Sequence, residues 1–403
     1  MKILLITTSR WASAARLAMA LADVGCHVET LCPRNHPMRK TSIVRRHMLF
    51  HPLLPLGSIK RAIRRSNPDF VISCDELTVL YLHRLHAQAS PEIRALIERS
   101  LGDPAGYSLT HHCNQLMTLA QEEGVATPAT AEVPTPASIP GLAARFGLPL
   151  ILKADGTTGG QGVRILTETY GAEKLWSTLR APIGPVRLLK RMLVDSDWNG
   201  VIPFLRREKR VVNAQSFVPG TEANMVVACW KGELLSALCF EVASVWYPRG
   251  PSSVVRVVKN SAMEEAARKI VKRLNLSGFC GFDFILDEIT GAPLMIEMNA
   301  RPTQLAHLSL GDGRDLITAW LSAANGTSMR ARPAVTGKDL IAIFPHELHR
   351  DPGSPELQNA YHDVPWSEPA LVLACLRKPS KLASWRPHLQ WLNVRSFLGL
   401  RKS

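Results

Sequence analysis

Residues 294–302 read Leu-Met-Ile-Glu-Met-Asn-Ala-Arg-Pro, an apolar strand that carries an acid and an amide two residues apart. Side chains two apart face the same side of a strand, so Glu297 and Asn299 project together. Asp283 lies on the preceding predicted strand, and the turn at 287–291 brings it beside Glu297 if the two strands pair. Two carboxylates and an amide oxygen at one point form a hard, oxygen-only site of the kind that suits Mg²⁺. The stretch therefore predicts a metal site.

Arg301 follows at the same spacing, two residues beyond Asn299. A guanidinium there could stabilise negative charge on a transferring phosphoryl group. The alternative interpretation is an ordinary solvated hairpin edge. Strand interiors seldom alternate acid and amide with apolar residues without a partner, and this favours the metal site.

A glycine-rich loop lies earlier in the chain, between two predicted strands. It follows Lys153 and contains Gly156, Gly159, Gly160 and Gly162. Its backbone N–H groups can approach phosphate oxygens because no Cβ intervenes, and Lys153 adds a positive charge. The spacing is neither that of a Walker A loop nor that of a dinucleotide fingerprint, since no helix follows directly. Taken alone, the loop could equally be a flexible hairpin.

Residues 215–222, Gln-Ser-Phe-Val-Pro-Gly-Thr-Glu, predict a strand that ends in a Pro-Gly bend. Such an end exposes backbone N–H and C=O groups that can pair with the edge of an adenine. Glu222, just past the bend, could bind ribose hydroxyls. Without the other two motifs this segment would read as an ordinary strand and turn.

The first ~105 residues alternate strands and helices in the manner of a Rossmann-like lobe. Asp75 and Glu76 follow the last of these strands, at the edge where open α/β sheets bind ligands. They could contact an amine or cap the following helix. Later segments predict antiparallel strands and an amphipathic helix at 263–274. Beyond Ser328 the chain is Pro-rich and carries no pattern that indicates chemistry.

Composition indicates a globular protein, with 46% apolar residues and a net charge of +14. The basic clusters lack interleaved aromatics, so we expect a generally basic surface suited to nucleotides and acidic substrates, and no specific nucleic-acid partner. Eight cysteines without metal spacing indicate reduced core residues and a cytoplasmic protein. No signal peptide or membrane-spanning segment is expected. The tail at 385–402 could lie on a membrane surface or pack against the protein's own body.

In this order the three motifs resemble the ATP-grasp superfamily, over roughly residues 107–321. The resemblance implies an α/β protein that is α+β in its ATP-grasp part. It predicts a Rossmann-like pre-ATP-grasp lobe at 1–105 and a two-lobed ATP-grasp domain at 106–328. The lid subdomain of that domain is expected at about 128–215, and a C-terminal extension at 329–403.

The resemblance also implies a role for each motif residue, in ATP binding, metal binding or catalysis. The residues are Lys153 for the α- or β-phosphate; Gly159, Gly160 and Gly162 for the lid; Gln215 (side chain), Ser216 (carbonyl) and Val218 (amide) for adenine; Glu222 for ribose; Asp283, Glu297 and Asn299 for Mg²⁺ or Mn²⁺; and Arg301, with Lys153, for catalysis.

The activity implied is ATP- and Mg-dependent ligation, in which a small-molecule carboxylate is activated as an acyl phosphate and attacked by an amine or thiol, with release of ADP. A homodimer is compatible with the resemblance. Arg249 and Arg256 are candidates for pairing with the substrate carboxylate, although either could be an ordinary surface arginine.

One departure from the family concerns the segment before the helix expected at 116–123. Members usually carry a second lysine there, whereas this chain reads His-His-Cys-Asn-Gln at 111–115. The phosphate contact is either missing or supplied by another basic group such as His111 or His112. The departure supports an alternative function, a non-catalytic ATP-binding sensor. A glycosyltransferase-like enzyme is suggested only by the opening strand, turn and helix, and the metal strands argue against it.

Overall fold

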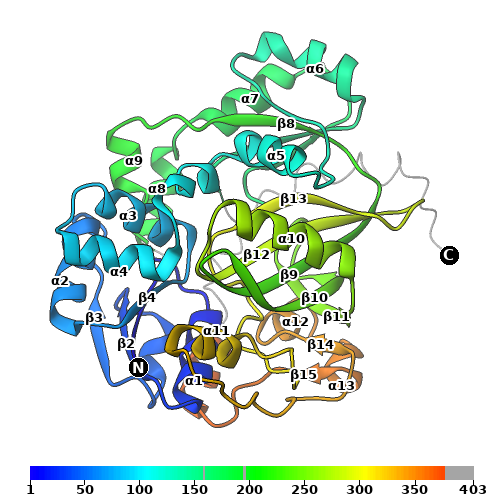
Figure 1. Ribbon diagram of the computed structural model, residues 1–403. Coiled ribbons are helices and arrows are strands. Elements are labelled where there is room, and N and C mark those ends of the chain that lie inside the picture. Colours follow the sequence, from blue (N-terminus) through cyan, green and yellow to red (C-terminus); the bar gives the residue numbers. More distant parts are fainter. Residues whose placement is uncertain (158, 194–196, 377–403) are drawn as a thin grey trace.

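The computed structural model describes residues 1–157, 159–193 and 197–376, and within them the strands form three sheets. A parallel sheet belongs to the N-terminal lobe, a small antiparallel sheet forms a lid, and a seven-stranded sheet lies below the lid (Figure 1). The α/β fold class is confirmed. No helix among these residues is long and apolar enough to cross a membrane.

The N-terminal lobe is a parallel sheet of strand order β3-β2-β1-β4 with helices on its faces. Apolar runs form its central strands: every residue of Ile3–Ile6 is fully buried. Ile6 pairs with Leu31 on one side and Ser73 on the other, so the carboxyl ends of three strands meet at one edge. The elements are β1 (Lys2–Ile6), α1 (Ser13–Asp23), β2 (His27–Cys32), the 3-10 helix η1 (Pro37–Lys40), β3 (Arg46–Leu49), α2 (Pro55–Ser66), β4 (Phe70–Ser73), α3 (Glu76–His86), α4 (Pro91–Leu101) and the 3-10 helix η2 (Pro104–Gly106).

The lid sheet has the order β5-β8-β6-β7 and is antiparallel throughout. The glycine-rich loop joins β6 to β7, which pair from Leu150–Leu166 to Lys153–Val163. Helices α8 and α9 leave this sheet and reach the N-terminal lobe, where Asn199 Nδ2 donates to the carbonyl of Thr8 at 3.1 Å. The elements are β5 (Thr130–Glu132), the 3-10 helix η4 (Pro136–Ser138), α6 (Ile139–Phe146), β6 (Leu150–Ala154), β7 (Val163–Leu166), α7 (Ala172–Arg180), α8 (Pro185–Leu193), α9 (Val201–Leu205) and β8 (Val212–Ser216).

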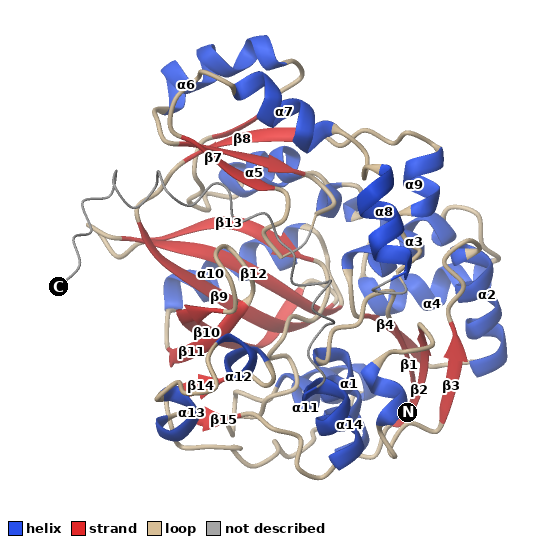
Figure 2. Ribbon diagram, turned by 180° about the vertical axis from the view of Figure 1, so that it is seen from behind, coloured by secondary structure: helices blue, strands red, loops and turns tan. Residues whose placement is uncertain are grey.

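The large sheet has the order β13-β12-β9-β10-β11-β14-β15 and is covered on both faces (Figure 2). Successive residues of β9 alternate between two cores. Met225 and Val227 pack with α5 and α10, whereas Val226 and Ala228 pack with α11 and the N-terminal lobe. The elements are the 3-10 helix η3 (Leu109–His111), α5 (Cys113–Glu122), β9 (Gly220–Trp230), β10 (Glu233–Val245), β11 (Ser252–Val258), α10 (Ser261–Arg273), β12 (Gly278–Asp287), β13 (Pro293–Asn299), α11 (Leu316–Asn325), β14 (Leu340–Ala342), α12 (His346–Arg350), α13 (Glu356–Asn359), β15 (Tyr361–His362) and α14 (Pro369–Leu376).

The segment after Ser328 is more ordered than its sequence pattern suggests. β14 pairs with β11 and β15 pairs with β14, so this segment completes one edge of the large sheet. Both strands are too short to show a periodicity, which explains why none was visible. The predicted boundaries at 105 and 328 and the lid limits stay predictions, and the tail at 385–402 lies outside the described residues.

Candidate active site between the lid and the large sheet

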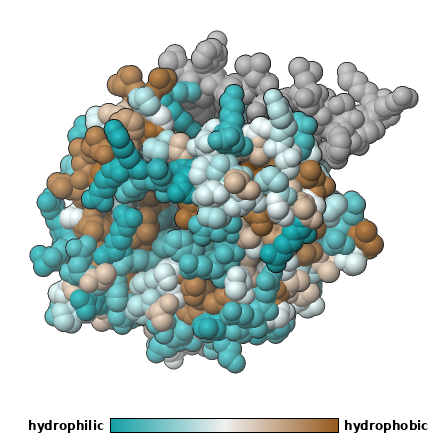
Figure 3. Space-filling view, turned by 90° about the horizontal axis from the view of Figure 1, so that it is seen from above, coloured by the Kyte–Doolittle hydropathy of each residue, from teal (hydrophilic) through white to brown (hydrophobic). Residues whose placement is uncertain are grey.

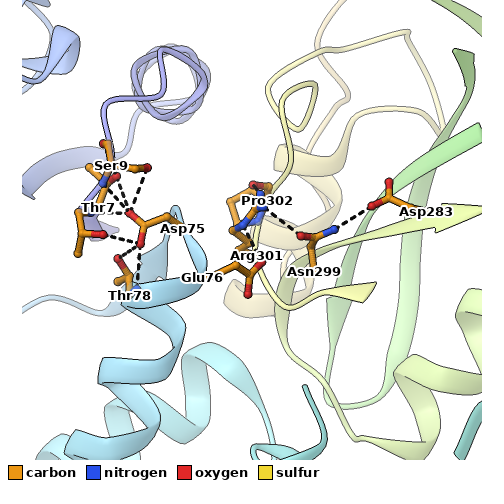
Figure 4. Close-up of polar contacts among 10 residues, drawn as sticks. Thr7, Ser9, Asp75, Glu76, Thr78, Asp283, Asn299, Arg301 and Pro302 are labelled. Atoms are coloured by element: carbon orange, nitrogen blue, oxygen red, sulfur yellow. Dashed lines mark hydrogen bonds and ion pairs between the residues drawn. The ribbon is translucent and has the colours of Figure 1, made fainter. Parts of the chain in front are cut away.

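The three predicted metal ligands lie together on the β12–β13 hairpin. Asp283 is directly opposite Glu297, and Asn299 is opposite Gly281. Asn299 Nδ2 donates a hydrogen bond to Asp283 Oδ2 at 3.1 Å (Figure 4). The predicted strand pairing is therefore correct, and the role of these side chains as metal ligands stays a prediction.

Arg301 links this group to the N-terminal lobe. Its Nε donates to Glu76 Oε1 at 2.9 Å, and a terminal nitrogen donates to Asn299 Oδ1 at 3.0 Å. Figure 4 shows the resulting chain of contacts, which runs from Glu76 at the start of α3 to Asp283 on β12. Glu76 thus lies in the candidate site, whereas from the sequence a contact with an amine and a cap on the helix were both open for it.

Asp75, its neighbour, has a structural role. Its Oδ1 accepts the backbone N–H of Thr78 at 2.9 Å and so caps α3. The same carboxylate also accepts bonds from the turn after β1, including the Thr7 hydroxyl at 2.8 Å and the Ser9 N–H at 3.1 Å. The capping alternative is therefore correct for Asp75, which is only 7% exposed.

Lys153 reaches from the lid to the large sheet, where its Nζ donates to the carbonyl of Ile296 on β13 at 3.4 Å. Burial raises the pKa of the Asp283 carboxyl, and the Glu297 charge raises it further against the opposing effects of Arg301 and Lys153. Burial likewise raises the pKa of Glu76, although Arg301 opposes this. Burial is the largest cause in both cases, so both shifts mark carboxyl groups that are largely removed from water.

The charged groups around Asp283 carry an excess of negative charge. The carboxylates of Glu76, Glu222, Asp283 and Glu297 outnumber the two cations Lys153 and Arg301. A divalent cation would relieve this excess, and oxygen donors are the ligands that Mg²⁺ prefers. Among the described residues no group of three or more His, Cys, Asp or Glu side chains is placed to hold a metal. The donor set that fits is two carboxylates and the amide oxygen of Asn299.

The glycine-rich loop is seated on the β10–β11 hairpin. Tyr247 Oη donates to the carbonyl of Gly159 at 3.3 Å. Gly160 has a φ of 68°, and a methyl group at its Cα would overlap the carbonyl oxygen of Arg249. A methyl group on Gly162 would overlap the side chain of Thr157. The loop therefore needs glycine at both positions for close approach, and at Gly160 for its positive φ as well.

The predicted nucleotide-binding segment leaves β8 and enters β9. Gln215 is buried and its Nε2 donates to Thr130 Oγ1 at 3.0 Å, so this side chain is held within the lid sheet. Ser216 ends β8, Val218 is half-buried in the bend, and Glu222 is exposed on β9 opposite Ile285. The structure thus places these residues along one connection between the lid and the large sheet. Their contacts with adenine and ribose stay predictions.

A cavity of about 100 Å³ joins the motifs. Its lining includes Glu76 from the N-terminal lobe, Lys153 and Gly156 from the lid, His112 before α5, and Glu297 from β13. Segments far apart in the sequence therefore meet at one point. The described lining residues include neither of the two candidate substrate arginines. Arg256 is exposed on β11, and the carbonyl of Arg249 lies against Gly160 of the glycine-rich loop.

Sequence reasoning missed Asp155 and Asn213, which line a second cavity of about 150 Å³ together with His112. Asn213 Nδ2 donates to Asp155 Oδ1 at 2.7 Å, and His112 Nδ1 lies 3.6 Å from Asp155 Oδ2. Burial raises the pKa of Asp155 to about 6, although the N–H of Cys113 and the His112 charge oppose this. The alternation of the strand was a usable signal, because Asp155 lies two residues after Lys153.

The two histidines before α5 differ in their surroundings. His111 Nε2 shares a hydrogen bond of 2.8 Å with His83 Nδ1, whose ring stacks on Tyr107. Burial, and after it the nearby His112 charge, lowers the pKa of His111 to about 4, so His111 is neutral at physiological pH. Both histidines line the cavity of Glu76 and Lys153, whereas of the two His112 alone also lines the second cavity, where it faces Asp155.

Comparisons with known proteins agree with this geometry. Residues 195–304 match the family model of the ATP-grasp domain. This region contains the nucleotide-binding bend and all three predicted metal ligands, but neither Lys153 nor the glycine-rich loop. No curated protein matches the chain significantly.

Solved structures extend the likeness to most of the chain. Biotin carboxylase from Campylobacter jejuni superposes with a TM-score of 0.58 at 16% identity, over 81% of this chain and 71% of that one. N5-carboxyaminoimidazole synthetase from Staphylococcus aureus gives 0.57 at 12%, over 82% and 79%. Carboxyaminoimidazole ribonucleotide synthase from Aspergillus clavatus, in complex with ATP, gives 0.58 at 14%, over 83% and 78%.

These comparisons establish the fold. The chain has the ATP-grasp fold, and its residues 195–304 match the ATP-grasp domain family. The resemblance stated from the motifs is confirmed at the level of the fold.

Proposed function

We propose that the protein is an ATP- and Mg-dependent ligase that activates a carboxylate as an acyl phosphate for attack by an amine or a similar nucleophile. The observation that supports it best is the arrangement of charges at and beside the cavity. Lys153 of the lid reaches β13, where Asp283, Glu297 and Asn299 lie together and Arg301 adjoins them. A triphosphate fits such a site because its oxygens can meet cations from both sides. Structures of similar fold that contain ATP support this nucleotide.

The metal would be held by Asp283, Glu297 and the Asn299 amide oxygen. Mg²⁺, or Mn²⁺ in its place, would neutralise phosphate oxygens and polarise the γ-phosphoryl group. Asn299 Oδ1 accepts a hydrogen bond from Arg301 in this structure. Metal binding would therefore release that donor, and the Arg301 guanidinium would then be available to the transferring phosphoryl group.

The remaining motif residues would bind and enclose ATP. Lys153 would contact the α- or β-phosphate, and the loop of Gly159, Gly160 and Gly162 would cover the phosphates and exclude water. The connection from β8 to β9 would hold the adenine through Gln215, Ser216 and Val218 and the ribose through Glu222. The Gln215 side chain donates one bond to Thr130, which leaves its amide oxygen and a second N–H for a contact with adenine.

The reaction would proceed in two displacements. A carboxylate oxygen of the substrate attacks the γ-phosphorus, the bond to the β,γ-bridging oxygen breaks, and ADP leaves. The amine nitrogen then attacks the acyl carbon, the bond to the phosphate oxygen breaks, and phosphate leaves as the nitrogen loses a proton. Exclusion of water matters in the interval, because water would otherwise hydrolyse the acyl phosphate.

His112 is our candidate for the basic group that stands in for the absent lysine. Both histidines line the cavity that contains Lys153 and Glu297, but His111 is half-buried, neutral and engaged with His83, whereas His112 faces Asp155. The side chain of His112 is 44% exposed, so it is free to turn toward a phosphate. A cytoplasmic setting is part of the same proposal and is supported by the eight free cysteines.

The alternative, a non-catalytic ATP-binding sensor, is favoured by the missing lysine at 111–115. Hydroxylamine trapping separates the two functions. Protein, Mg-ATP and hydroxylamine are mixed with pools of small carboxylates, and ADP and acyl hydroxamate are measured. The ligase predicts matched release of both products with at least one pool, lost in Glu297→Gln and retained in His112→Lys. ATP binding without ADP release from any pool would favour the sensor.

A further inference from the structure

The helices α8 and α9 carry an exposed apolar surface that the proposed reaction does not use. Val186, Leu189 and Leu193 follow the spacing i, i+3, i+7 and form one face of α8. Their exposed fractions are 82%, 54% and 72%. Leu205 at the end of α9 is 72% exposed and Trp198, between the helices, is 42% exposed. We call these five residues the α8–α9 patch.

The segment before α9 packs against α8. The backbone N–H of Asp197 donates to the carbonyl of Arg191 at 2.9 Å, which holds the start of the α9 segment against the end of α8. Gly200 lies against Leu188, the buried residue of α8. Figure 3 looks down from the lid side and shows hydrophobic surface along its left side, where α8 and α9 lie in Figure 1. Exposed apolar surface of this kind usually marks an interaction site.

Basic residues border the patch. Residues 185–210 contain seven Lys or Arg and three Asp or Glu. Lys190, Arg207 and Lys209 form no ion pair within the described ranges, and Arg206 pairs only with Glu208 at 3.8 Å. Apolar side chains on one face, with cations beside them, are the pattern of a helix that lies in the interface of an anionic membrane.

Charge argues against two other occupants. A second copy of this chain would bring together two surfaces of the same sign, in a protein of net charge +14. The chain's own tail at 377–403 contains seven Lys or Arg and no Asp or Glu, so it would be repelled by the same cations. An anionic lipid surface matches both the apolar face and the basic border.

We propose that the α8–α9 patch binds peripherally to membranes that contain anionic lipid, with Val186, Leu189 and Leu193 entering the interface. The inference is independent of the ligase function, because none of these residues belongs to the candidate active site. It places the lid beside the membrane, since Arg187 of α8 donates to Gln161 of the glycine-rich loop at 2.6 Å.

The test is co-sedimentation of the full-length protein with vesicles of phosphatidylcholine alone or mixed with phosphatidylglycerol. We expect binding to the anionic vesicles only, weakened by added salt. Leu189→Glu with Leu193→Glu should lower the partition coefficient at least about tenfold, because two apolar side chains no longer enter the interface. The matched control is Ile289→Glu with Val335→Glu, which adds the same charge at exposed apolar positions elsewhere. This control should bind as the parent does.

Several results would overturn the proposal. These are equal binding to neutral and anionic vesicles, no binding to either, an equal loss in the control, or unchanged binding by the Leu189/Leu193 variant. Binding that survives the double substitution and disappears when residues 377–403 are removed would assign the contact to the tail. A change of mass in solution for the double variant would assign the patch to a second copy. Thermal unfolding of each variant establishes that it is folded, as expected for exposed positions.

Discussion

Asp75 and Glu76 are neighbours in the chain with different roles, and the difference comes from their surroundings. Asp75 accepts hydrogen bonds from the turn after β1 and from the start of α3, whereas Glu76 turns to Arg301. One carboxylate holds the edge of the N-terminal sheet together, and the other connects that edge to the candidate active site. At the residue scale, the partner of a side chain decides its function more than its type does.

Gly160 offers a test of how the glycine-rich loop closes. Gly156 and Gly160 both have positive φ, 69° and 68°, but only Gly160 is pressed against another segment. Both substitutions to Ala carry the same backbone strain, about 1 kcal/mol. Gly160→Ala should in addition displace the loop from Arg249 and lower kcat at least about tenfold, whereas Gly156→Ala should have a small effect. Steady-state ADP release, with a carboxylate identified by hydroxylamine trapping as substrate, gives kcat for each variant. Equal losses in both variants would contradict the role of the contact between Gly160 and Arg249.

Asp155 predicts a pH dependence of stability. Burial raises its pKa to about 6, so between pH 4 and 6 the folded state keeps a proton that the unfolded chain has lost. Its contribution therefore becomes less favourable as the pH rises through that window, by up to about 3 kcal/mol. Asp155→Asn should remove this loss, and its advantage over the parent should grow from pH 4 to pH 7.

Urea unfolding of the ligand-free protein at several pH values measures the effect. Asp312→Asn, at an exposed position, is the control and should follow the parent at every pH. An Asp155→Asn curve parallel to that of the parent would show that the carboxyl has an ordinary pKa.

At the scale of elements, the β12–β13 hairpin combines a well-packed apolar face with two carboxylates that repel each other. Its apolar side chains, Phe282, Phe284 and Met295, are fully buried in the core. Asp283 and Glu297 face one another across the hairpin, and burial followed by their repulsion raises the pKa of Asp283. The two carboxylates thus destabilise the ligand-free protein, and a bound cation would remove this destabilisation.

Asp283→Asn should separate these two effects. The neutral amide keeps the shape of the side chain and relieves the repulsion, so the ligand-free protein should gain about 1–2 kcal/mol of stability near pH 7. The same variant should lose the stabilisation that Mg²⁺ with ATP gives the parent. Thermal unfolding with and without Mg-ATP measures both, and a variant that is less stable alone or equally stabilised by Mg-ATP would contradict the account.

Many of the strands and the pairing in this hairpin could be predicted from the sequence. The pairing of Asp283 with Glu297 follows from strand alternation and one short turn, both of which are local properties. β14 and β15 escaped prediction because strands of two or three residues show no periodicity, and β3 escaped because Arg-His-Met-Leu lacks the apolar run that revealed β4. The contacts of Gln215 with Thr130 and of His111 with His83 depend on tertiary packing between distant segments, so no local pattern could reveal them.

At the scale of the molecule, a buried ion pair joins the C-terminal segment to the rest. Asp363, beside β15, pairs with Arg16 of α1 and lies 2.7 Å from His307 Nε2. Its side chain is only 2% exposed. The N-terminal lobe, the segment after β13 and the C-terminal segment therefore meet at this carboxylate. The sequence held no signal for it, since the partners are 347 and 56 residues away.

Asp363→Ala should destabilise the whole protein by about 3–5 kcal/mol, because Arg16 and His307 would remain buried without the carboxylate. Chemical denaturation measures the loss. Asp351→Ala removes an exposed carboxylate in the same segment and should cost less than about 1 kcal/mol. A loss for Asp363→Ala as small as that of the control would show that the buried contact does not hold the segment in place.

The central claim is that Mg²⁺ and ATP bind together in the cavity between the lid and the β12–β13 hairpin. Calorimetric titration with a non-hydrolysable ATP analogue, with and without Mg²⁺, tests it most directly. We predict Mg-dependent binding to the parent, at least about tenfold weaker in Glu297→Gln. Glu288→Gln, an exposed position in the turn of the same hairpin, should bind as the parent does. Absence of nucleotide binding to the parent, or equal Mg-dependent affinity in Glu297→Gln, would contradict the account.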